Sequence, residues 1–259
     1  MRLATWNVNS LAARLGRIEA WLVEVAPDVV CLQETKLADA AFPGLAFEAL
    51  GYEWAHHGQG RWNGVAILSR VGLADPAIGF APGAIVARDE ARILSATCGG
   101  IRVASIYVPN GRSPDHEQFA FKLKWLAALR THLDASCSPD TPVVVAGDFN
   151  IAPADRDVWD PTAVANATHV TPDERGALAE LEAWGLSDVF RRHHDGDGLY
   201  SWWDYRAGNF HKGLGMRIDL VLATEVLASR SCWALIDRNA RKGKPTPSDH
   251  APVIVELDS

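Results

Sequence analysis

The stretch "VVVAGDFN", residues 143–150, takes a run of apolar residues directly into polar ones. Its first four residues have the character of a strand that is buried on both faces, which is typical of α/β proteins. Asp148 and Asn150 follow at once, so this strand would bring a carboxylate and an amide to its end. Groups held at the ends of rigid elements are placed accurately, as a binding or catalytic site requires.

The same change from apolar to polar residues recurs along the chain. It occurs in "LATWNVNS" with Asn7, "VVCLQETK" with Glu34, "VASIYVPNG" with Tyr107 and Asn110, "RIDLVLA" with Asp219, and "SDHAPVIVEL" with Asp249 and His250. An aspartate after one strand is most often a turn residue. Several such ends in one chain indicate instead that polar groups converge on one rim.

Helical patterns alternate with these strands. Apolar residues recur at helical spacing from Leu11 to Val25, and Pro27 closes that segment. Ser113 is expected to cap a second helix, and Thr171 with Glu174 has the spacing of a capping box. The strands outnumber the helices too strongly for a regular barrel. We therefore predict one α/β domain over residues 1–259, with two sheets packed face to face and helices outside.

Composition limits the class of protein. The chain has 259 residues, of which 48% are hydrophobic, yet no stretch approaches the roughly 18 apolar residues of a membrane span. The first residues run straight into a strand-like segment without a signal-peptide pattern, so we expect a cytoplasmic protein. Cys31 and Cys98 lie in strand-like runs and are expected to be reduced core residues. The net charge of −7 argues against a general nucleic-acid coat but not against a DNA enzyme.

The polar set at the strand ends has a recognisable chemistry. It holds carboxylates, amides, one histidine and one tyrosine, and no cysteine. Oxygen-rich sites of this kind suit Mg²⁺ or Mn²⁺ rather than zinc. A hard cation beside a histidine is suited to hydrolysis of a phosphate ester, because the cation offsets charge that develops on the phosphate.

The motifs "TWNVNS", "LQETK", "YVPNG", "GDFNIAP", "MRIDLVLA" and "SDHAPV" occur in this order over residues 5–252. This succession closely resembles the exonuclease III family of AP (apurinic/apyrimidinic) endonucleases. The "SDH" motif is shared across the wider endonuclease/exonuclease/phosphatase superfamily, whereas "LQETK" and "WWDYR…GMRIDL" are typical of its DNA-repair branch. The resemblance implies a four-layer α/β sandwich.

The resemblance also implies roles for individual residues. Glu34 would be the principal Mg²⁺ ligand, with Asn7 and Asp249 close to the ion. The residues expected to act on the phosphate or the attacking water are Asp148, Asn150, Tyr107 and His250, with Asp219 as the carboxylate partner of His250. A small pocket for a base-free sugar would be formed by Trp202, Met216 and Ile218, although some relatives carry an aromatic residue in place of Met216. Further substrate contacts are expected from Asn110, Arg112 and Arg217.

By this resemblance the chain would be a Mg²⁺-dependent DNA repair phosphodiesterase that incises 5′ to abasic sites and trims 3′ ends of duplex DNA. Its partner would be double-stranded DNA, with no membrane, and we expect a monomer. Two alternatives stay open from the sequence. One is an enzyme of the same fold that acts on lipid or inositol phosphates, and the other is a catalytically silent DNA-binding protein.

Overall fold

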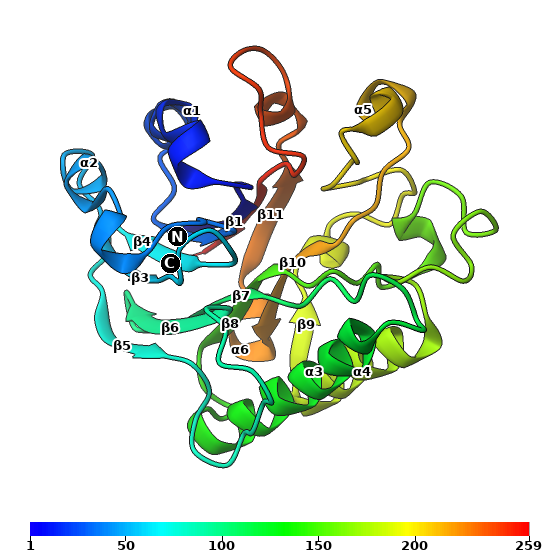
Figure 1. Cartoon of the computed structure of the whole chain (residues 1–259). Coiled ribbons are helices and arrows are strands. Elements are labelled where there is room, and N and C mark those ends of the chain that lie inside the picture. Colours follow the sequence, from blue (N-terminus) through cyan, green and yellow to red (C-terminus); the bar gives the residue numbers. More distant parts are fainter. Residues whose placement is uncertain (259) are drawn as a thin grey trace.

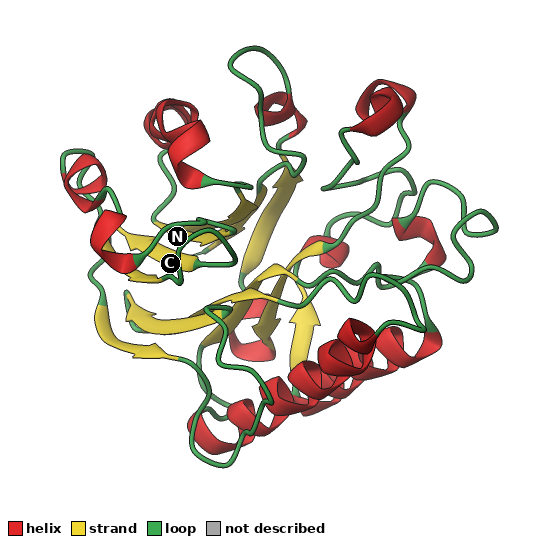
Figure 2. Ribbon diagram, in the orientation of Figure 1, coloured by secondary structure: helices red, strands yellow, loops and turns green. Residues whose placement is uncertain are grey.

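The computed structural model describes residues 1–258 and shows two β-sheets packed face to face with helices on both outer sides (Figures 1 and 2). Each sheet has six strands. Their orders are β11-β12-β1-β2-β4-β3 and β5-β6-β7-β8-β10-β9. The prediction of a four-layer α/β sandwich with two mixed sheets is confirmed.

The strand bounds follow chain order. In the first sheet they are β1 (Arg2–Asn7), β2 (Val29–Gln33), β3 (Glu53–His57), β4 (Val65–Ser69), β11 (Ser231–Ile236) and β12 (Val253–Leu257). In the second sheet they are β5 (Ala74–Ile78), β6 (Ile93–Cys98), β7 (Ile101–Tyr107), β8 (Val143–Asp148), β9 (Leu186–Asp188) and β10 (Asp219–Thr224).

The helices cover the outer faces of the two sheets (Figure 1). Helices α1 (Leu11–Val25) and α2 (Gly44–Glu48) pack on the first sheet, and α3 (Glu117–Ser136) and α4 (Pro172–Trp184) pack on the second. Two short helices, α5 (Asn209–Lys212) and α6 (Glu225–Ala228), complete the set. Among the described residues, none of these helices is long and apolar enough to cross a bilayer.

Strand β8 explains why the stretch 143–150 is apolar at successive positions. Val143 and Val145 pack into the core formed with α3 and α4, whereas Val144 and Ala146 pack into the core between the sheets. Successive side chains of a strand point to opposite faces, so a strand covered on both sides needs apolar residues throughout. The first polar position is Asp148, where the strand ends.

The direction of the strands brings their polar ends together. Strands β1 and β2 run parallel in the first sheet, and β7 and β8 run parallel in the second. Across the sandwich β1 lies near β8, and β2 lies near β7. The ends of these strands therefore meet at one rim of the sandwich.

Helix boundaries confirm one capping prediction and correct another. Thr171 caps α4 and forms the expected capping box with Glu174, and Gly185 follows the last turn with φ 123°. The prediction that Ser113 caps α3 is wrong. His116 is the N-cap and its Nδ1 accepts from the Gln118 N–H at 3.0 Å, because a turn closed by His116 N–H to Ser113 O precedes the helix. Cys31 and Cys98 are buried free cysteines, as predicted.

Gly147 offers a test of how tightly this rim is packed. A Cβ added there would lie 1.9 Å from the carbonyl oxygen of Ile106 on β7. We expect Gly147→Ala to lower the free energy of unfolding by about 1–3 kcal/mol, the usual cost of overpacking. Gly176→Ala in α4 is the control, because its Cβ would meet nothing within 4 Å. That change is expected to stabilise the protein by about 0.5–1 kcal/mol. Urea denaturation measures both, and unchanged stability of Gly147→Ala would contradict the packing argument.

Candidate active site

A cavity of about 140 Å³ lies at the rim where the strand ends meet. Its lining comes from both sheets and from the loops between them. The lining residues are Glu34, Tyr107, Asn110, Asp148, Asn150, His169, Trp202, Ile218, Asp249 and His250. The structure thus brings together most of the residues that the sequence singled out.

Asn7 joins the carboxylates of the two sheets. Its Nδ2 donates to Glu34 Oε1 at 2.8 Å and to Asp148 Oδ2 at 2.9 Å. Glu34 follows β2, Asp148 ends β8, and Asn7 ends β1, so one buried amide links three strand ends. In this arrangement Asn7 faces the carboxylates with its nitrogen, as a donor that holds them in place.

His250 and Asp219 form a second buried pair. His250 Nδ1 lies 2.8 Å from Asp219 Oδ2, and Ser201 Oγ donates to the same oxygen at 2.6 Å. Asp219 stands directly opposite Asp148 in the antiparallel pairing of β10 with β8. His250 Nε2 lies 3.8 Å from Asp148 Oδ2 and is left to donate toward the cavity.

These contacts shift two pKa values. Burial alone would lower the pKa of His250, but Asp219 and Asp148 outweigh it and raise this pKa to about 10. Burial, together with Asp219 and Glu34, raises the pKa of Asp148 to about 7, against His250 and the Asn7 amide. His250 is therefore an imidazolium at neutral pH. Its protonated form stabilises the fold fully below the ordinary histidine pKa of about 6.5, and this contribution is lost as pH rises through about 10.

Asn150 and Asn110 form the amide side of the cavity. Asn150 has a left-handed backbone with φ 52°, and its N–H donates to Asp148 Oδ1 at 2.9 Å. Its Nδ2 donates to Val108 O at 2.9 Å, while Asn110 Nδ2 donates to Asn150 Oδ1 at 3.1 Å. The two side chains are thus tied to each other and to the end of β7.

Tyr107 lies at the end of β7 and lines the cavity. Burial, with the nearby carboxylates of Glu34 and Asp148, raises the pKa of Tyr107 well above its usual range. The phenol therefore stays protonated and can act as a hydrogen-bond donor.

The apolar side of the cavity is formed by Trp202 and Ile218. Trp202 pairs with Met216 through two backbone hydrogen bonds of 2.9 Å, and its Nε1 donates to Asp249 Oδ2 at 3.1 Å. Met216 itself does not line the cavity. It is buried behind it in a small apolar cluster that also contains Ile218.

The structure does not bring the two predicted arginines to the cavity. Arg217 is fully buried, and its guanidinium donates to Asp157 at 2.6 Å and to Asp188 at 2.7 Å. The expectation that Arg217 contacts substrate is therefore corrected, because its guanidinium is buried and forms ion pairs with these two aspartates. Arg112 is exposed with φ 63° and does not line the cavity.

Sequence reasoning missed His169 and Ser201. His169 is buried, lines the cavity, and has a left-handed backbone with φ 84°. Its ring centroid lies 6.3 Å from that of Trp202. His169 follows no strand, so the strand-end pattern could not identify it. No local pattern in the sequence singles it out.

The donor set fits a hard divalent cation. Ligand atoms of Glu34, Asp148 and His250 lie within 4.8 Å of one another. His250 is a cation held by Asp219, and Asp148 Oδ2 lies 3.8 Å from His250 Nε2, so Glu34 is the more suitable carboxylate donor for the ion. Asp249 also lines the cavity, but its oxygens accept hydrogen bonds from Asn9 Nδ2 at 2.9 Å and from Trp202.

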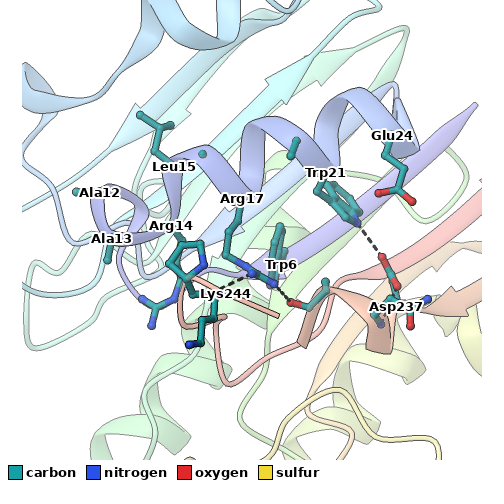
Figure 3. A pocket seen from close by; sticks show the side chains of 15 residues that line it. Trp6, Ala12, Ala13, Arg14, Leu15, Arg17, Trp21, Glu24, Asp237 and Lys244 are labelled. Atoms are coloured by element: carbon teal, nitrogen blue, oxygen red, sulfur yellow. Dashed lines mark hydrogen bonds between the residues drawn. The ribbon is translucent and has the colours of Figure 1, made fainter. Parts of the chain in front are cut away.

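A larger hollow of about 450 Å³ lies beside α1, against residues 237–245 (Figure 3). Arg17 donates there to Ala240 O and Pro245 O, both at 3.0 Å, and Trp21 Nε1 donates to Asp237 at 2.9 Å. None of the carboxylates of the strand-end cavity lines it. We therefore place the chemistry in the smaller cavity.

The charge of Asp219 can be tested directly. In Asp219→Asn the amide keeps the shape but loses the charge, so the pKa of His250 should fall by about 1–3 units. The measurement is an NMR titration of the His250 ring. Asp237→Asn, whose carboxylate contacts Trp21, is the control and should leave that pKa unchanged. An unaltered pKa in Asp219→Asn would refute the pairing.

Comparisons with known proteins agree with this geometry. The model of the Endonuclease/Exonuclease/phosphatase family matches residues 4–250. Exodeoxyribonuclease III from Haemophilus influenzae is 34% identical to this chain, and the alignment covers 99% of this chain and 100% of that protein. An AP endonuclease from Archaeoglobus fulgidus superposes with a TM-score of 0.95 at 36% identity, covering 100% of both chains. The 3′ phosphatase NExo from Neisseria, bound to a product DNA hairpin, superposes with a TM-score of 0.95 at 37% identity and the same coverage. This chain belongs to the endonuclease/exonuclease/phosphatase family, in its exodeoxyribonuclease III branch.

Proposed function

We propose that this protein is a Mg²⁺-dependent DNA repair phosphodiesterase that incises 5′ to abasic sites, leaves a 3′-hydroxyl, and processes 3′ ends of duplex DNA. The observation that carries the proposal is the joining of Glu34 and Asp148 by Asn7 beside a protonated His250. The relatives named as exodeoxyribonuclease III and AP endonuclease support the choice of DNA as substrate.

The chemistry follows from the charges in the cavity. A bound Mg²⁺ would be held by Glu34 and would offset negative charge on the scissile phosphate. His250 donates from Nε2 to a phosphate oxygen, while Asp219 holds its Nδ1 proton in place. Negative charge that develops on the phosphate is therefore stabilised by the His250 imidazolium, which is already oriented. Little reorganisation of the site is then needed during the reaction.

Asp148 is the residue suited to activate water. Burial, with the carboxylates of Asp219 and Glu34, raises its pKa above that of an ordinary aspartate, which makes this carboxylate a stronger base. Asn150 and Asn110 can position the water or a phosphate oxygen from the amide side. Tyr107, which stays protonated, can donate to the phosphate or to the leaving 3′-oxygen.

A second candidate is processing of 3′ ends alone, as a 3′-phosphatase or exonuclease. His169 favours it, because its ring stands near Trp202 in a cavity of only about 140 Å³. A terminal phosphate needs less room than a flipped-out sugar, so the small cavity supports the 3′-phosphatase in particular. The relative named as a 3′ phosphatase supports this candidate as well.

One experiment separates these functions. A duplex with a single tetrahydrofuran abasic analogue, labelled at its 5′ end, and a nicked duplex with a 3′-phosphate are each incubated with Mg²⁺ or with EDTA. A single incision that leaves a 3′-hydroxyl, only with Mg²⁺, is expected for AP endonuclease action. Loss of the 3′-phosphate or a ladder of shortened products, without incision at the analogue, would favour the second candidate.

Asp148→Asn is the matched inactive variant for this experiment. Loss of the base should lower turnover at least about 10²-fold while DNA binding persists. Wild-type turnover in this variant would remove Asp148 from the reaction. If the wild-type protein cleaves neither duplex, release of phosphate from inositol phosphates tests the remaining enzymatic alternative, and binding without cleavage would indicate a silent DNA-binding protein.

Glu34 is expected to set the metal requirement. In Glu34→Gln, the loss of a negative oxygen ligand should raise the Mg²⁺ concentration for half-maximal activity at least about tenfold. Glu24→Gln is the control, because Glu24 is exposed on α1 beside the second hollow. An identical metal titration in Glu34→Gln would exclude Glu34 as a ligand.

A further inference from the structure

Lys122 is a fully buried cation directly behind the amide side of the cavity. It lies on α3, and its Nζ donates to the carbonyl oxygen of Asn150 at 2.6 Å. The same Nζ lies 3.4 Å from the carbonyl oxygen of Asn110 and is bonded to Glu174 Oε1. One ammonium group therefore contacts the backbones of both residues whose side chains form the amide side.

Glu174 extends this network from α4. It is also fully buried, and Oε1 accepts from Thr168 Oγ1 at 2.8 Å and from the His169 N–H at 2.9 Å. Its Oε2 accepts from the N–H of Thr171 at 3.1 Å and from its hydroxyl at 2.7 Å. The carboxylate thereby joins the capping box of α4 to the loop that carries His169.

Lys122 and His169 meet at the carbonyl oxygen of Asn150. The left-handed backbone of Asn150 turns its carbonyl oxygen toward Lys122, and His169 Nδ1 lies 2.5 Å from the same oxygen. A non-glycine residue in this conformation is uncommon and persists only where its surroundings hold it. Gly111 lets the Asn110 loop come close, because a Cβ there would lie 2.6 Å from Thr168 Oγ1.

Stability alone does not explain a buried ion pair. Such a pair loses solvation on both sides, and apolar residues of similar volume are often as stabilising. The pair instead fixes the relative positions of three loops, because all of its hydrogen bonds can form only when these loops adopt one arrangement. These loops are residues 108–112, 148–152 and 168–171, and they carry Asn110, Asn150 and His169.

From these contacts we infer that Lys122 and Glu174 are positioning residues, which fix Asn110 and Asn150 in the orientation that the reaction requires. The inference rests on the proposed function for its catalytic consequence. The pair touches no substrate, since both residues are fully buried and neither lines the cavity. Its effect is therefore on turnover rather than on binding.

The test is Lys122→Met, measured on whichever duplex the wild-type protein cleaves, at a temperature where both proteins are fully folded. We expect kcat to fall about 10–100-fold, as for a small misplacement of catalytic groups, with KM changed less than about threefold. Leu126→Ala is the matched control. Leu126 is buried on the same helix in the apolar core, so its loss destabilises α3 while every hydrogen bond of the Lys122–Glu174 network is kept.

A second readout does not depend on activity. Hydrogen exchange of the Asn150 side-chain amide, followed by NMR, should be faster in Lys122→Met but unchanged in Leu126→Ala. Should Lys122→Met not fold, Thr168→Val removes the hydroxyl contacts to Glu174 and to the carbonyl oxygen of Asn110 without leaving a buried charge unpaired, and a smaller loss of kcat is expected.

The outcomes separate the inference from the proposed function. Wild-type kcat and wild-type amide exchange in a folded Lys122→Met or Thr168→Val variant would overturn the positioning role. A wild-type protein that cleaves no DNA would overturn the proposed function. In that case faster exchange in Lys122→Met would still support the positioning of Asn150.

Discussion

Burial of both faces of the central strands is the constraint on which this structure depends. A strand such as β8 lies between the opposite sheet and a helical layer, so its interior positions favour apolar side chains. Burying a charged group at these positions costs free energy, so charged side chains lie at the strand ends instead. Parallel pairing of β1 with β2 and of β7 with β8 then directs these ends to one rim. The active site is a consequence of how the layers are covered.

Charges at and behind this rim are paired with groups of opposite charge. His250 pairs with Asp219, Lys122 with Glu174, and Arg217 with Asp157 and Asp188. A buried charge without a partner would cost several kcal/mol, so each pair also fixes the distance between two segments. The cavity can therefore hold a cationic histidine and two carboxylates within a few ångströms of one another.

The sequence predicts the parts of this arrangement that depend on local pattern. Apolar runs that stop at Asp148, Asn7 and Glu34 identify strand ends, and the spacing of Thr171 and Glu174 identifies a helix start. Sequence reasoning fails where a side chain is oriented by tertiary contacts. Arg217 follows a motif that suggests substrate contact, yet its direction is set by two aspartates far away in the chain. His169 reaches the cavity only because Glu174 and Asn150 hold its loop.

The direct pairing of Asp148 with Asp219 across β8 and β10 has a further consequence. Two carboxylates on facing positions of neighbouring strands repel, and the raised pKa of Asp148 means that its ionised form is disfavoured in the folded state. Burial is the main cause of this raised pKa, so ionisation of Asp148 above the ordinary aspartate pKa lowers the free energy of unfolding. The rim is thus a place where ionisation of a buried carboxyl lowers stability, and that carboxyl belongs to the residue that we propose as the base.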